Sequence, residues 1–219
     1  MRVLIVRAEP GASATAARAL ARGFEPIIAP LFEISDVEWP PADPNAYDAV
    51  MMTSAHAARL GGMLLPAYWH LPLFAVGAAT AQAAREAGFT SIHTGTGNVD
   101  ALLEDLRDHG VGRILHLAGE DHRVPDTGWL RIERRVVYAA RPIQPPPLLP
   151  DAPIILIHSP RNGARLAELI GPEERATRAL IAISAAAADA AGSGWADVRI
   201  ASAPKDDEVL ACAVKLCRV

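Results

Sequence analysis

The sequence predicts an α/β protein of two similar lobes, each with a parallel sheet flanked by helices in a doubly wound arrangement. Three observations lead to this prediction. Short apolar runs alternate with alanine-rich stretches along the chain, the alternation repeats half-way along, and proline-rich tracts bound two extended segments. Strands that alternate with helices imply βαβ units, because neighbouring parallel strands need a crossover connection.

The composition is that of a folded, packed chain. It has 219 residues, 51% hydrophobic and 21% charged, which excludes intrinsic disorder for most of its length. The formal net charge is −4 without a long basic run, so we expect no nucleic-acid partner. Cys212 and Cys217 lie five positions apart, which is poor disulfide geometry if the segment is helical, and this favours reduced thiols and a cytoplasmic location. The apolar runs are too short or too polar to span a membrane.

The individual elements follow from the alternation in chain order. Gly23 ends the first helix as a C-terminal glycine, and Pro30 ends the second strand. We expect strands at 3–6, 26–29, 48–52, 73–76, 91–93, 113–117, 153–157, 180–183 and 198–200, and helices at 13–21, 55–65, 78–87, 99–108, 161–169, 185–191 and 206–216.

Two segments break the alternation. Residues 33–39 are extended but lead into no helix, and two prolines follow them. Residues 131–141 alternate like a half-buried strand and precede another proline-rich tract. Such tracts beside extended segments mark linkers. We therefore expect these segments to run side by side as a narrow ribbon between the lobes.

An internal repeat supports two lobes of the same kind. Three landmarks recur at nearly one offset: Ser54 with Ser159 (105), Gly77 with Ser184 (107) and Gly88 with Gly194 (106). Duplication by itself says nothing about chemistry.

Small and hydroxyl-bearing residues, with one arginine, follow the predicted strands. In an open parallel sheet, ligands bind beyond the carboxyl ends of the strands, where helix N-termini also point. Each position taken singly is best explained as a helix cap. Taken as a set, with residues of the two lobes expected to face one another, these positions favour a binding site for a ligand with many carboxylates or phosphates. Its members are Arg7, Thr53, Ser54, Gly77, Ala78, Ala79, Thr80, Gly119, Ser159 and Ser184.

Other chemistry has little support in the sequence. The glycines at 95 and 97 and the segment 77–80 match neither a dinucleotide fingerprint nor a phosphate loop. His116, Glu120, Asp121 and His122 have no spacing typical of a metal site. We therefore expect no metal and no cofactor.

The chain resembles the uroporphyrinogen-III synthase family across nearly its whole length. The resemblance rests on the order and spacing of short motifs that are individually weak. These lie at residues 3–7, 23–31, 48–54, 75–81 with 87–88, 114–119, 136–138, 157–160 and 195–204.

The resemblance implies two α/β lobes joined by a two-stranded ladder, one lobe being discontinuous. The first lobe would take 1–33 and 142–219, and the second 34–141, including the linker strands. It also implies a lyase of tetrapyrrole (heme-type) biosynthesis without a cofactor. This enzyme would cyclise hydroxymethylbilane, a polycarboxylate, to uroporphyrinogen III with inversion of ring D and loss of water. We expect a cytoplasmic monomer.

The resemblance also implies roles for particular residues. Tyr138 and Thr80 become the catalytic candidates. The candidates for substrate binding are Arg7, Thr53, Ser54, His56, Gly77, Ala78, Gly119, Ser159, Arg161 and Ser184. The chain departs from the family at 184–187 (Ser-Ala-Ala-Ala), where a glycine followed by paired threonines is common. Two alternatives are a degenerate homologue that binds a tetrapyrrole or other polyanion without turnover, and an unrelated two-lobe binding protein.

Overall fold

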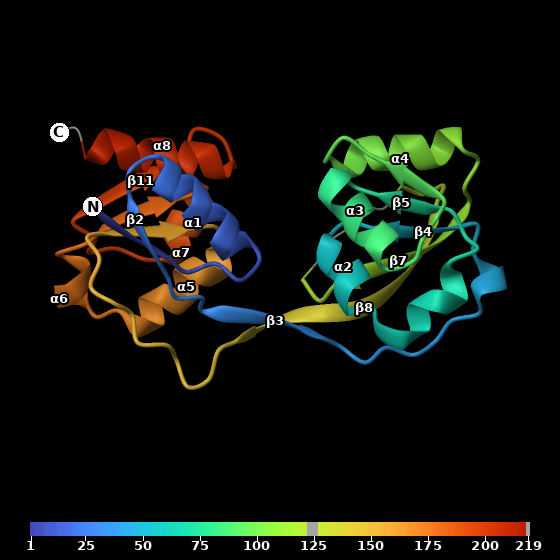
Figure 1. The fold of residues 1–219 in the computed structure, drawn as a ribbon, viewed down its shortest axis with the longest axis horizontal. Coiled ribbons are helices and arrows are strands. Elements are labelled where there is room, and N and C mark those ends of the chain that lie inside the picture. The colour runs from blue at the N-terminus through green and yellow to red at the C-terminus, as the bar shows by residue number, and fades with distance from the viewer. Residues whose placement is uncertain (122–126, 218–219) are drawn as a thin grey trace. The chain divides into compact units, whose positions relative to one another are not determined.

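The computed structural model describes residues 1–121 and 127–217. The chain divides into two compact units, unit 1 (Met1–Glu33 and Arg141–Val219) and unit 2 (Ile34–Ala140). Each unit holds a largely parallel sheet with helices on its faces (Figure 1). The predicted fold class is confirmed. The expected second lobe included Arg141, which falls in unit 1. That the units fold as separate domains stays a prediction.

The sheet of unit 1 has the order β11-β10-β9-β1-β2, and its strands pair in parallel. Its central strands are almost wholly buried, which explains why they occur as continuous apolar runs. The strands are β1 (Arg2–Ile5), β2 (Glu25–Ile28), β9 (Ile154–Ile157), β10 (Ala179–Ala182) and β11 (Asp197–Ile200).

Helices cover both faces of this sheet (Figure 1). Val3 and Ile5 point to the face where α1 and α8 pack. On the other face α5 and α7 lie very close together, and a Cβ at Gly163 would collide with the Ala187 carbonyl oxygen. The helices are α1 (Gly11–Ala21), α5 (Pro160–Leu169), α6 (Pro172–Arg175), α7 (Ala185–Ala190) and α8 (Asp206–Leu216).

The second sheet has the order β3-β8-β7-β4-β5-β6, and the strands from β8 to β6 pair in parallel. Val50 and Met52 face α2 and α3, whereas Met51 and Phe74 face α4. The elements are β3 (Phe32–Asp36), η1 (Pro44–Ala46), β4 (Ala49–Met52), α2 (Ala55–Leu60), η2 (Gly62–Tyr68), β5 (Leu73–Ala75), α3 (Ala78–Glu86), β6 (Ile92–Thr94), α4 (Val99–Asp108), β7 (Arg113–Gly119) and β8 (Arg131–Pro142).

The helix expected at 55–65 is wrong in its second half. It ends at Leu60, and a 3-10 turn follows. Gly62 has φ +70°, a left-handed conformation that stops an α-helix and favours glycine. The short elements η1 and α6 have no counterpart in the sequence-based assignment.

The two expected linker segments are neighbouring strands, β3 and β8. The boundaries between the units fall inside both strands. Val37 N donates to Val137 O within unit 2, and Ile143 N donates to Leu31 O within unit 1, each at 3.0 Å. Because positions rise along one strand as they fall along the other, the two strands run antiparallel.

Both sheets share one strand order. When β11-β10-β9-β1-β2 is written beside β6-β5-β4-β7-β8, β9 corresponds to β4 and β10 to β5. These are the strands whose ends the sequence repeat matches, Ser159 with Ser54 and Ser184 with Gly77. Then β1 corresponds to β7, although β1 precedes β9 in the chain while β7 follows β4. The two units are thus one arrangement with its chain order permuted.

Candidate functional site

The carboxyl ends of β4 and β7 form the topological switch point of unit 2. These strands lie side by side, and the chain continues from β4 toward β5 on one side and from β7 toward β8 on the other. Open α/β sheets bind ligands at such a point. Thr53 follows β4 directly, and Gly119 is the last residue of β7.

Tyr138 lies at this edge against Gly119. The pairing of β7 with β8 shifts register between Ala118 and Gly119, so that Gly119 stands opposite Tyr138. A Cβ at Gly119 would lie 2.6 Å from the tyrosine ring, so only glycine leaves room for the ring. On another side the Tyr138 and His56 rings are 5.4 Å apart at 45°. The half-buried phenol is therefore held between two neighbours.

Two histidines flank this tyrosine and the adjacent strand end. Burial lowers the pKa of His56, and the nearby charge of Arg59 lowers it further, so the ring is neutral at pH 7. Thr53 Oγ1 lies 3.2 Å from Nε2 of the fully buried His116. From the sequence, His116 is considered only as a metal ligand, and its spacing argues against that role. Its position in β7, close to Thr53 just after β4, follows from the pairing of the two strands and could not be inferred from spacing.

The helix N-termini at this edge differ in their caps. Ser54 caps α2, and its hydroxyl accepts a hydrogen bond from His56 N at 3.2 Å. Helix α3 has Gly77 as its N-cap and no side-chain cap. The first amides of a helix have no partner within it, and Ala78 and Ala79 are at least partly exposed here. Uncapped amides beside exposed small side chains suit an anion.

Thr80 is less accessible than its expected catalytic role requires. It lies in the first turn of α3 with only 5% of its surface exposed. A direct catalytic role stays a prediction, and Tyr138 is the better placed of the two candidates.

Unit 1 has a charged cluster at its own switch point, between β1 and β9. Asp206 Oδ1 accepts hydrogen bonds from Thr15 Oγ1 at 2.9 Å and from His158 Nε2 at 2.8 Å. Arg7 Nη1 lies 3.7 Å from the same oxygen, and Arg18 Nη1 lies 2.8 Å from Oδ2. The predicted Arg7 is thus part of a network whose carboxylate, Asp206, is absent from the predicted strand-end set. The same rule could have found Asp206, because it opens the helix that follows β11.

Burial controls the protonation of this cluster. Desolvation lowers the pKa of His158 to about 4, and the charge of Arg7 acts in the same direction. Burial would raise the pKa of Asp206, but hydrogen bonds from Thr15 and His158, with Arg18, hold it below its usual range. His158 is therefore neutral at pH 7, and its contact with Asp206 is a hydrogen bond from Nε2–H. Desolvation also lowers the pKa of Arg7.

The remaining predicted residues of unit 1 lie at helix N-termini. Ser159 caps α5, accepting from Asn162 N and donating to Asn162 Oδ1. Ser184 caps α7 through Ala187 N at 3.3 Å. The guanidinium of Arg161 lies 5.0 Å from the Phe32 ring. Ser54, Ser159 and Ser184 each act as caps, as expected for single positions.

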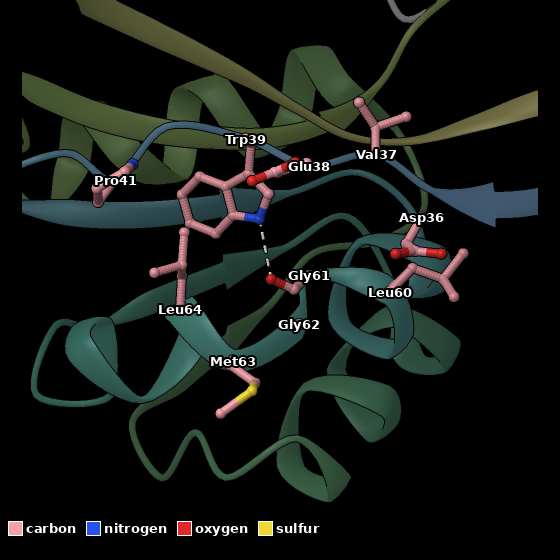
Figure 2. A pocket seen from close by; sticks show the side chains of 10 residues that line it. All are labelled: Asp36, Val37, Glu38, Trp39, Pro41, Leu60, Gly61, Gly62, Met63 and Leu64. Atoms are coloured by element: carbon pink, nitrogen blue, oxygen red, sulfur yellow. Dashed lines mark hydrogen bonds between the residues drawn. The ribbon is translucent and has the colours of Figure 1, made fainter.

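A separate hollow of about 510 Å³ opens beside the N-terminal end of η2. Figure 2 shows Trp39 over it, with Nε1 donating to the Gly61 carbonyl oxygen at 2.9 Å. Asp36 and Glu38 line it, and none of the predicted site residues does. Two carboxylates and no cation among its lining make it unsuited to a polycarboxylate.

The profile of the family described as uroporphyrinogen-III synthase HemD matches residues 13–211. The chain belongs to the uroporphyrinogen-III synthase family. Uroporphyrinogen-III synthases are lyases that cyclise hydroxymethylbilane in tetrapyrrole biosynthesis, so the expected family and reaction class are confirmed.

A solved structure agrees on the fold. Uroporphyrinogen-III synthetase from Helicobacter pylori 26695 has a TM-score of 0.66 at 18% identity, over 99% of this chain and 100% of that one. A mutant uroporphyrinogen III synthase from the extremely thermophilic bacterium Thermus thermophilus has a TM-score of 0.47 at 18% identity, over 100% of both chains. No curated protein matches the chain.

Two further expectations can be compared with the structure. Cys212 and Cys217 are unpaired, as predicted. Among the residues described, every helix is too short or too polar to cross a membrane. Of the dismissed metal candidates, His122 lies outside the described residues.

Protonation of His158 predicts a pH-dependent stability. Its folded pKa of about 4 lies below the unfolded value near 6.5, so the unfolded chain binds more protons between these values. The free energy of unfolding should therefore fall from pH 6.5 to pH 4, by roughly 3 kcal/mol from this group. Urea unfolding over this range should show that His158→Gln loses much of the slope. The exposed His70→Gln is the control, and equal slopes in both variants would contradict the prediction.

Proposed function

We propose that this chain converts hydroxymethylbilane to uroporphyrinogen III, with inversion of ring D and loss of water. The observation that carries this proposal is the family match over residues 13–211. The geometry adds hydrogen-bond donors at the carboxyl ends of both sheets. The substrate cyclises unaided to the uninverted isomer, so the protein's task is to hold a conformer that closes through the substituted carbon of ring D.

Binding of the substrate carboxylates rests on backbone and arginine donors. The uncapped N-terminus of α3, with Gly77 and Ala78, offers amides to one carboxylate. Arg7 keeps one-third of its side chain exposed while Asp206 orients it. A guanidinium has five N–H donors, so Arg7 can contact Asp206 and a substrate carboxylate together. Thr53, Ser54, Ser159, Arg161 and Ser184 supply further polar groups at the strand ends.

Tyr138 is the group we assign to the departing hydroxyl of ring A. Its phenol can donate a hydrogen bond to that oxygen as the bond to carbon breaks. Gly119 and His56 fix the ring, so the donor is oriented before the substrate arrives. A neutral His56 places no positive charge beside the cation that forms on ring A when the hydroxyl leaves.

We also propose that the enzyme is a cytoplasmic monomer without a nucleic-acid partner. The net charge of −4 without a long basic run, and the two unpaired cysteines, support this proposal.

The product isomer tests the proposed function. Freshly generated hydroxymethylbilane is supplied to the purified protein, and the products are oxidised and separated chromatographically. We expect the type III isomer to dominate. Type I alone, at the rate of a protein-free control, would instead support the alternative of a homologue that binds without turnover.

Tyr138→Phe should slow formation of the type III isomer at least about tenfold. This loss is smaller than that for full proton transfer, because the phenol is proposed only to donate a hydrogen bond to the departing hydroxyl. The fold should be unaffected, because the aromatic ring remains against Gly119. Tyr47→Phe is the matched control, since Tyr47 lies in the same unit, near Glu133 and just before β4, at the opposite end of the sheet from the carboxyl ends of the strands. Equal rates for Tyr138→Phe and the control would reduce Tyr138 to a packing residue.

Ala79→Glu should raise the KM for hydroxymethylbilane without lowering the thermal midpoint. A carboxylate in the first turn stabilises a helix but repels the substrate carboxylate proposed to bind there. Ala79→Gln has nearly the same shape without charge and should change KM much less. If the two variants have the same KM, α3 does not bind the substrate.

A further inference from the structure

His93, Asp105 and His109 form a cluster in unit 2 that the proposed function does not use. One ring nitrogen of each histidine and one Asp105 carboxylate oxygen lie within 4.8 Å of one another. His93 is the middle residue of β6, Asp105 lies in α4, and His109 is the C-cap of that helix.

The fold brings these residues together from separate elements. Asp105 and His109 are four positions apart, so they share one face of α4. His93 stands beside Phe74 in the parallel pairing of β6 with β5, so both side chains point to the same face of the sheet. Phe74 contacts α4 on that face. The three polar side chains therefore meet where α4 ends over the edge strand.

The buried ring of Phe74 packs against both histidines of the cluster. It is 1% exposed, and its ring stacks on His93 with centroids 4.5 Å apart at 10°. The ring of His109 stands nearly edge-on to Phe74, at 5.4 Å and 77°. The two imidazoles are 4.3 Å apart at 67°. Stacking on this buried ring orients His93 before any ligand binds, whereas the more exposed His109 keeps room to rotate.

The hydrogen bonding of His109 suits a metal ligand. Its Nδ1 lies 2.8 Å from the Asp105 carbonyl oxygen and 3.3 Å from Oδ1 of the same residue. A proton on Nδ1 donated to this carbonyl leaves the lone pair on Nε2, and such backbone bonds commonly orient metal-binding histidines. The C-terminal end of α4 also favours a cation through the helix dipole.

We propose that His93, Asp105 and His109 bind a Zn²⁺-type divalent cation, with solvent completing the coordination. Two imidazoles and a carboxylate suit borderline ions such as Zn²⁺, whereas Mg²⁺ and Ca²⁺ prefer oxygen ligands. Tetrahedral bonds of about 2.1 Å place ligand atoms ~3.4 Å apart. The cluster closes to this size by side-chain rotation, for which Asp105 and His109, 36% and 42% exposed, have room.

The ion would tie the edge strand β6 to the last turn of α4. Strand β7 starts at Arg113, shortly after His109, so His109 lies at the end of the sheet where strands begin. Tyr138 and Gly77 lie at the opposite end. The site is therefore structural, and its occupancy should change stability without changing the isomer produced.

Titration of the chelator-treated full-length protein with Zn²⁺ tests this site. Calorimetry should show one saturable equivalent, excess Mg²⁺ should not compete, and Co²⁺ should give visible absorption typical of a low-symmetry site. The thermal midpoint should rise with Zn²⁺. His109→Gln and His93→Asn should each weaken binding at least about tenfold, the loss seen even when only a hydrogen-bond partner of a metal ligand is removed.

His70→Gln, an exposed histidine in the same unit, is the matched control and should bind as the unaltered protein does. Because His109 is exposed, His109→Gln should fold even if His93→Asn does not. Absence of saturable Zn²⁺ binding would overturn the proposal. So would equal Zn²⁺ affinity in His109→Gln and the control, since the ion would then bind elsewhere.

Discussion

The close approach of Tyr138 to Gly119 is the contact on which the proposed site of unit 2 depends. It exists because the ladder between β7 and β8 shifts register by one residue at the end of β7. Without that shift the tyrosine would not stand opposite the glycine at the strand end. Without the glycine the ring would collide with a side chain. A local irregularity in backbone pairing thus turns an ordinary strand residue toward His56 and the adjacent helix N-termini.

The Asp206 network of unit 1 shows a different solution at the corresponding place. There Arg7 lies two residues after the end of β1, and the carboxylate of Asp206, from the last helix, orients it. Unit 2 orients a neutral phenol by shape, whereas unit 1 orients a cation by charge. The two units share a strand order but present different donors.

The sequence was sufficient for the fold and for much of the strand-end list, because both depend on local patterns. Buried parallel strands occur as apolar runs, and Ser54, Ser159 and Ser184 precede helices as caps do. The sequence was insufficient where contacts join distant positions. Asp206 meets Arg7 because α8 packs beside α1, and His93 meets His109 only through β5 and α4. The Gly61-Gly62 pair is a local turn signal that could have marked the break in the helix expected at 55–65. The apolar residues before and after the pair, Leu60 and Met63, continue the helical pattern across it.

The permuted chain order affects how the protein assembles during synthesis. The strands from β4 to β8 are contiguous, so unit 2 can complete its ladder as soon as β8 leaves the ribosome. In unit 1 the pairing of β1 with β9 joins Val3 to Ile154, about 150 residues apart in the chain. The first two strands and α1 must therefore wait, with one edge of β1 exposed, while the whole of unit 2 is made. The folding of this N-terminal segment should therefore depend most on the speed of translation and on contact with chaperones.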